Sequence, residues 1–185
     1  MREVYLLDTN IILDAILPVS ANRPNRCAVL ANLEKLSETE DIVALSVIAM
    51  AEVTFGLFKQ EEAAREEIDS ISAFWEMHPF HLPIDDGTIE PYSRIRAELF
   101  RVYGTPRASG RSYREKLPED LYDRVTGRIL GIDERDLLIA SVAVQYNYVL
   151  VTNDEKESMN RIQKCAASLS AAGQPTALRV QQWKT

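Results

Sequence analysis

Residues 3–12 read Glu-Val-Tyr-Leu-Leu-Asp-Thr-Asn-Ile-Ile, and this stretch decides the fold. A short, continuous apolar run that ends in an acid is typical of a strand buried on both faces in a parallel sheet. Asp8 closes this run, and apolar residues at helical spacing follow it until Pro18. The stretch therefore predicts a strand at 3–8 and a helix directly after it.

The same order of a short apolar run and a helix recurs along the chain. A second pair covers 42–46 and 47–59, and near the end an apolar helix opened by Asp136 precedes a β-branched strand at 148–152. We also expect strands at 80–84 and 177–181 and helices at 25–37, 61–77, 86–103, 119–130 and 155–170. Alternating strands and helices predict an α/β fold whose central, mainly parallel sheet is covered on both faces.

Length and charge bound the domain organisation. A chain of 185 residues is within the usual size of one domain, so we expect a single domain over 1–185. The net charge of −7 disfavours a general polyanion binder. Between Arg94 and Lys116, however, seven basic residues stand against two acids. With its Gly, Pro and Ser residues, the region 104–130 is interpreted as an exposed basic insertion.

The location of the protein is predicted from what the sequence lacks. The N-terminus shows no basic leader followed by an apolar stretch and a small-residue cleavage site. No apolar run reaches the ~18–20 residues of a membrane span. Cys27 and Cys165 are too few and too far apart for a disulfide framework, and we expect both to be buried or half-buried. We therefore expect a soluble, cytoplasmic protein that does not contact a membrane.

Four acids are candidates for chemistry: Asp8, Glu52, Asp136 and Asp154. Asp8 and Asp154 follow predicted strands, at the edge of a parallel sheet where ligands bind. Each acid also has an ordinary structural explanation: Asp8 and Asp136 as helix N-caps, and Asp154 as a turn residue. Glu52 is harder to explain in this way, because apolar residues surround it and an unpaired buried carboxylate is costly.

Carboxylates that cluster repel one another, so a site of three or four needs a cation to stay ionised. Oxygen ligands suit magnesium or manganese. Such a site serves phosphoryl chemistry, in which the metal neutralises the phosphate and activates a water. The four acids therefore favour a metal-dependent enzyme that acts on phosphate esters.

The segments around these acids resemble those of the PIN-domain nucleases and, among them, the VapC-like toxins of bacterial toxin–antitoxin pairs. The similar segments are Tyr-Leu-Leu-Asp-Thr-Asn-Ile-Ile-Leu-Asp at 5–14, Leu-Ser-Val-Ile-Ala-Met-Ala-Glu-Val at 45–53, Asp-Leu-Leu-Ile-Ala-Ser-Val-Ala at 136–143 and Val-Leu-Val-Thr-Asn-Asp at 149–154. Each motif alone is weak, whereas four in this order are specific. The resemblance covers roughly 3–160 in outline, and the long gap between the second and third acids contains the basic insertion.

The resemblance implies a PIN-like three-layer α/β/α fold and endonucleolytic cleavage of RNA. Mg²⁺ or Mn²⁺ would be held by Asp8, Asp136 and Asp154, with Glu52 as a ligand or water orienter. Asp133 is an open alternative as a further ligand. The resemblance also implies a homodimer that is inhibited by a small antitoxin protein.

Two groups of residues have interpretations that the sequence leaves open. The polar residues beside the acids either hold the carboxylates and a metal-bound water or act as ordinary turn and cap residues; they are Thr9, Asn10, Ser46, Thr152 and Asn153. The basic segment either grips single-stranded RNA or is a solvated loop. Its candidate phosphate contacts are Arg107, Arg111, Arg114 and Lys116, and its candidate stacking residues are Tyr103 and Tyr113.

Two rival functions remain. A non-catalytic PIN-like module that binds nucleic acid or protein would be expected to have lost one of the acids, and all four are present. A phosphatase that uses Asp8 as a nucleophile would resemble haloacid-dehalogenase-type enzymes, which place a second acid two residues on. That position is Asn10 in this chain. The RNA target, the physiological metal and the biological role do not follow from the sequence.

Overall fold

The computed structural model describes residues 2–17, 23–59, 65–110, 112–154 and 157–184. The chain divides into two compact units, which are described separately. The sheet unit comprises Met1–Ile84, Tyr148–Asn153 and Arg179–Thr185, and the helical unit comprises Asp85–Asn147 and Asp154–Leu178. The predicted single domain over 1–185 stays a prediction.

The described part of the sheet unit contains a five-stranded sheet in the order β3-β2-β1-β4-β5. The strands are β1 (Val4–Leu7), β2 (Ile42–Ser46), β3 (His81–Leu82), β4 (Val149–Val151) and β5 (Arg179–Gln181). Each described pairing is parallel, with Leu7 opposite both Leu45 and Val151. The predicted α/β fold with a mainly parallel sheet is confirmed, although β3 and β5 are shorter than the stretches 80–84 and 177–181.

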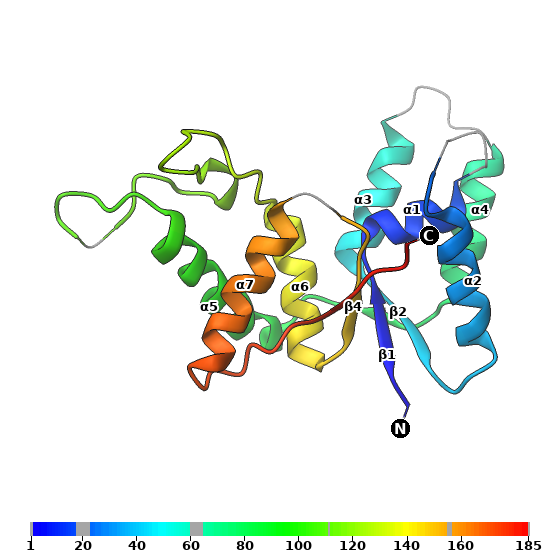
Figure 1. Cartoon of the computed structure of the whole chain (residues 1–185). Helices are drawn as coiled ribbons and strands as arrows, with labels where there is room; N and C mark the ends of the chain where they lie inside the picture. The colour runs from blue at the N-terminus through cyan, green and yellow to red at the C-terminus, as the bar shows by residue number, and fades with distance from the viewer. Residues whose placement is uncertain (1, 18–22, 60–64, 111, 155–156, 185) are drawn as a thin grey trace. The chain divides into compact units, whose positions relative to one another are not determined.

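The three central strands are short because each is an apolar run that ends at a polar residue. Leu6, Leu7, Leu45 and Leu150 have no exposed surface, as expected of strands covered on both faces. Their carboxyl ends lie in register at one edge of the sheet (Figure 1). The residues that follow β1, β2 and β4 are therefore gathered at this edge.

The described helices of the sheet unit are α1 (Thr9–Ile16), α2 (Arg26–Ser37), α3 (Val47–Phe58) and α4 (Arg65–Met77). Of these, α1 begins one residue after β1 and α3 begins directly after β2. The Ser46 hydroxyl accepts a hydrogen bond from the amide of Ala49 at 3.0 Å and so caps α3. Residues 61–64 of the predicted helix 61–77 lie outside the described residues. The prediction that Cys27 is buried or half-buried is wrong, because its position on α2 is exposed.

The helical unit is built on α5 (Asp86–Tyr103), α6 (Glu134–Tyr146) and α7 (Glu157–Ala171), which pack against one another (Figure 1). Ile95, Leu99, Leu137 and Ile162 have no exposed surface and form its core. Cys165 is buried here as predicted, and burial raises the pKa of its thiol to about 11. Residues 155–156 of the predicted helix 155–170 lie outside the described residues.

We call residues 104–130 the basic arm. The predicted helix at 119–130 is wrong, because its only helical part is a short 3-10 turn at Pro118–Asp120. The Asp123 carboxylate accepts hydrogen bonds from the amides of Val125 and Thr126 at 2.9 and 2.7 Å. These bonds favour a turn over a helix. Gly127 continues the turn with φ +69°, and Tyr122 then pairs with Ile129 in an antiparallel bridge.

Among the described residues, no helix is both long and apolar enough to cross a membrane.

Candidate active site

Asp8 follows β1 directly and is the most enclosed of the four candidate acids. It is only 3% exposed, and its amide donates to the carbonyl of Val151 at 2.9 Å. Its Oδ1 accepts from the amide of Thr9 at 2.7 Å, and its Oδ2 accepts at 2.6 Å from both Asn10 Nδ2 and Thr152 Oγ1. These donors replace the water that a buried carboxylate has lost, so Asp8 can stay charged.

The N-cap explanation of Asp8 accounts for only part of this arrangement. Asp8 does cap α1, through its bond from the amide of Thr9. A cap needs no side-chain donors from another strand, yet Thr152 supplies one from the end of β4. The second oxygen of Asp8 is therefore held in place by residues that capping does not require.

Glu52 lies in the second turn of α3, is half-buried and is linked to Asp8 through Thr9. The Thr9 hydroxyl donates to Glu52 Oε2, while the Thr9 amide donates to Asp8. One residue therefore orients both carboxylates. The structure thus connects two of the four predicted acids, which are 44 residues apart in the sequence (52 − 8).

The residues after β4 connect that strand to α1 and to the C-terminal segment. The Asn153 amide donates to Asn10 Oδ1 at 2.9 Å, and its side chain makes two bonds of 2.8 Å with the backbone of Trp183. Asp154 is the next residue and is half-buried. The structure thus shows Thr9, Asn10 and Thr152 holding a carboxylate. Asn153 braces Asn10, and Ser46 is a helix cap.

Asp136 lies in the helical unit, in the first turn of α6. Its Oδ2 accepts a hydrogen bond from Ser158 Oγ at 2.8 Å, and Ser158 Oγ accepts in turn from the amide of Asp133 at 3.3 Å. The N-cap explanation of Asp136 is wrong, because α6 begins at Glu134 and Asp133 is its cap. The Asp133 carboxylate accepts from the amide and the guanidinium of Arg135, and a ligand role for Asp133 stays untested.

Sequence reasoning missed two features of the helical unit. Ser158 is buried against Asp136, and a serine in a helix gives no signal of this contact. Arg96 forms an ion pair with Glu134 at 2.8 Å and donates to the Tyr92 hydroxyl, which itself donates to Glu134. Burial and the bond to Glu134 raise the pKa of Tyr92 to about 12, so the hydroxyl keeps its proton at neutral pH.

The four acids fit a hard divalent cation by their donor chemistry. They offer carboxylate oxygens, which Mg²⁺ and Mn²⁺ prefer, and the described contacts bring hydroxyl and amide donors that orient such ligands. The sheet unit contains Asp8 and Glu52, and the helical unit contains Asp136 and Asp154. Within the described ranges, no three His, Cys, Asp or Glu side chains form a group that could hold a metal ion.

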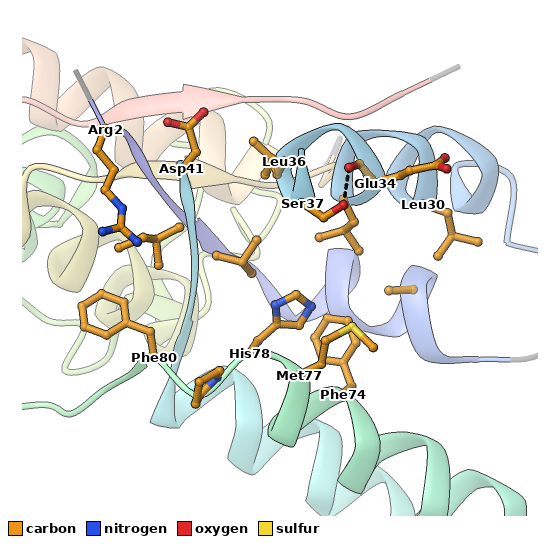
Figure 2. A pocket seen from close by; sticks show the side chains of 15 residues that line it. Arg2, Leu30, Glu34, Leu36, Ser37, Asp41, Phe74, Met77, His78 and Phe80 are labelled. Carbon is orange, nitrogen blue, oxygen red and sulfur yellow. Dashed lines mark hydrogen bonds between the residues drawn. The ribbon is translucent and has the colours of Figure 1, made fainter. Parts of the chain in front are cut away.

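A hollow of about 720 Å³ lies in the sheet unit. Figure 2 shows Phe74, Met77 and His78 on one side and Leu30 of α2 on the other. Burial lowers the pKa of His78, so its imidazole is neutral at pH 7. None of the four candidate acids lines this mainly apolar hollow. Its acidic lining residues are Glu34 and Asp41, so it is not the site predicted from the sequence.

Comparison with known proteins identifies the family. The model of the PIN domain matches residues 5–164, so the chain belongs to the PIN-domain family. The predicted PIN-like α/β/α fold class is thereby confirmed. Proteins of this family are generally nucleases that use divalent metal ions.

Solved structures agree with this fold. The chain is similar to a chain of VapBC2 from Rickettsia felis, bound to a fragment of promoter DNA, with 24% identity, a TM-score of 0.61 and coverage of 98% of this chain and 99% of that one. It is also similar to a chain of VapBC-1 from nontypeable Haemophilus influenzae (23% identity, TM-score 0.59, coverage 97% and 98%). A chain of FitAB bound to a DNA fragment is similar as well, with 20% identity, a TM-score of 0.59 and coverage of 98% of this chain and 96% of that one. No curated protein matched.

Proposed function

We propose that this protein is a divalent-metal-dependent endoribonuclease that hydrolyses phosphodiester bonds of RNA through Asp8, Glu52, Asp136 and Asp154. The observation that carries the proposal is the Asp8 carboxylate, buried at the carboxyl end of β1 and held by donors from α1 and β4. In parallel sheets this edge is where ligands bind. Membership of a family of nucleases supports the reaction class.

Each described contact has a role in this reaction. Thr152 and Asn10 fix the orientation of the second oxygen of Asp8, and Thr9 couples Asp8 to Glu52. Ser158 orients Asp136 in the same way. A bound Mg²⁺ or Mn²⁺ would supply charge neutralisation at the phosphate and an activated water. Carboxylates that are already oriented spare the cost of ordering them when the metal and the RNA bind.

The rival functions explain less of the structure. A binding module has no need for a buried carboxylate whose orientation is fixed by donors from two elements. In a phosphatase of the kind considered, position 10 would carry an acid, whereas here Asn10 donates its side-chain amide to Asp8. This hydrogen bond stabilises the charged form of Asp8. The amide of Asn10 cannot act as the general acid that a carboxyl group at this position would provide.

We propose further that the protein is the toxin of a toxin–antitoxin pair that acts in the cytoplasm and is held inactive by a small antitoxin protein. The similar solved structures support this role, because they are structures of VapBC and FitAB.

Replacing single acids tests the catalytic site. Asp8→Asn, Glu52→Gln, Asp136→Asn and Asp154→Asn should each lower the rate of cleavage of a mixed single-stranded RNA by at least about two orders of magnitude, because each removes a charged ligand. EDTA should abolish cleavage by the unsubstituted protein, and added Mn²⁺ should restore it. The rate is measured from gel-resolved products.

The matched control is Asp69→Asn, which makes the same change at an exposed position of α4 and should cleave normally. Cleavage that survives the loss of Asp8, or that is insensitive to EDTA in a fully active preparation, would overturn the proposed site.

Ser158→Ala tests whether the hydroxyl positions Asp136 for a metal ion. The variant should need about 10- to 100-fold more Mn²⁺ for half-maximal cleavage, because an orienting hydrogen bond is lost. Its rate at saturating Mn²⁺ should approach that of the unsubstituted protein. Ser141→Ala removes another buried hydroxyl of this unit, one that bonds only the carbonyl of Leu137 in the described contacts, and should leave the Mn²⁺ dependence unchanged. An equal effect of both substitutions would make Ser158 merely structural.

Expression in a bacterial host without any antitoxin tests the toxin role. Induction of the unsubstituted chain should arrest growth, while Asp8→Asn at the same protein level should not, because arrest requires RNA cleavage. If growth continues in the presence of active, RNA-cleaving protein, the proposed nuclease activity stands and the proposed toxin role is contradicted.

The proposal that the protein is a homodimer is supported by an exposed apolar face of α3. Phe55 is 63% and Phe58 is 79% exposed, and both line a shallow hollow. Light scattering should give twice the chain mass of 20.9 kDa, and Phe55→Ser/Phe58→Ser should give the monomer mass. Met77→Ser changes an exposed apolar residue of α4 and should stay dimeric. A monomeric unsubstituted protein would contradict the proposal.

A further inference from the structure

The basic arm is an ordered structure within the helical unit. We call residues 105–116 the basic loop, and in its described part Pro106 pairs with Tyr113 in an antiparallel bridge. The Arg107 amide donates to the carbonyl of Ser112 at 2.8 Å, and the Arg114 amide donates to that of Thr105 at 2.9 Å. These bonds fix the backbone from which the cationic side chains project.

The arm is fastened to the turn of α6 that contains Asp136. Arg96 donates to the carbonyl of Lys116 at 3.1 Å and forms its ion pair with Glu134 at 2.8 Å. The Glu134 amide donates to the Glu119 carboxylate at 3.0 Å. Glu134 is two residues before Asp136 in the same first turn of α6. The basic loop is therefore tied to the backbone beside a candidate ligand.

The charge of the basic loop is strongly positive and faces solvent. Arg107, Arg114 and Lys116 are exposed, and within the described residues no ion pair or side-chain hydrogen bond holds the last two. The acid of the loop, Glu115, is half-buried and accepts a hydrogen bond from the amide of Thr105 at 2.8 Å. Its carboxylate is therefore engaged by the backbone of the loop. Arg111 lies outside the described residues.

The two candidate stacking residues, Tyr103 and Tyr113, are packed against other side chains. The Tyr113 ring lies 5.7 Å from that of Phe100, and the Arg161 guanidinium lies 5.9 Å over the ring of Tyr103. A stacking platform needs an open ring face. These rings instead support the loop, so its recognition chemistry is that of exposed cations with phosphate groups.

An acidic protein is a less suitable partner for the basic loop. Protein interfaces depend on aromatic or aliphatic anchors at their centre. The exposed large apolar residues of the arm are Leu117, Val125 and Ile129, and none lies in the described part of 105–116. The exposed cations of the basic loop suit a nucleic-acid backbone by their charge.

We propose that Arg107, Arg114 and Lys116 bind backbone phosphates of the single-stranded RNA substrate and hold it beside the Asp136 turn. This inference rests on the proposed function, because it assigns the binding surface of the same reaction. Such contacts are independent of base sequence, so they supply affinity and register, and they do not select the cleavage site.

RNA binding by a cleavage-deficient Asp8→Asn protein tests the proposal. Arg107→Gln/Arg114→Gln/Lys116→Gln should raise the Kd for a labelled single-stranded RNA at least about tenfold. The slope of log affinity against log salt should fall by about 2, because roughly 0.7 is lost for each of three contacts. The measurement is fluorescence anisotropy over a range of salt concentrations, with circular dichroism to show that the fold is kept.

The matched control removes the same charge elsewhere. Arg2→Gln/Arg65→Gln/Lys164→Gln replaces two exposed arginines, ahead of β1 and on α4, and one exposed lysine on α7, and should leave Kd and slope unchanged. Equal weakening by both triple variants, unchanged RNA binding by the loop variant, or weakening confined to duplex DNA would each overturn the proposal. If RNA binding depends on the loop but the unsubstituted protein cleaves no RNA, the proposed function fails and the binding surface remains.

Discussion

The fold of the sheet unit depends on how the buried charge of Asp8 is stabilised. A carboxylate that is 3% exposed has lost almost all its water, at a cost of several kcal/mol unless protein groups replace it. Hydrogen bonds to a charged group contribute about 1.5–3 kcal/mol each. The donors come from Thr9 and Asn10, which continue the chain, and from Thr152, which is close only because β4 pairs with β1. The strand order and the charge therefore support each other.

The same solution recurs at the other acids. The Thr9 hydroxyl reaches Glu52, and the Ser158 hydroxyl reaches Asp136. In each case a short hydroxyl side chain orients a carboxylate from a different helix. Hydroxyl groups donate one hydrogen bond and have little conformational freedom to lose, so they fix a carboxylate without adding charge. Carboxylates oriented in this way are suited to bind a hard cation.

The elements that the sequence predicted correctly are those whose own residues form a clear pattern of apolar and polar positions. The central strands are apolar runs buried on both faces. Asp8 ends the first run, at the point where the chain leaves the sheet. The failures arise where side chains bond the backbone or a distant partner. Asp123 turns a predicted helix into a loop by accepting amide hydrogens, and Asp133 takes the cap expected of Asp136. Ser158 meets an acid 22 residues away, a contact that only the packing of α6 and α7 creates.

The central proposal is that Asp8, Glu52, Asp136 and Asp154 together bind a catalytic metal ion. Crystals soaked in Mn²⁺ and measured at the manganese absorption edge test it most directly. We predict an anomalous peak in direct contact with the carboxylates of Asp8 and of at least two of the other three acids, and no such peak in crystals of Asp8→Asn. A manganese ion bound by other residues in crystals of protein that cleaves RNA would contradict the account.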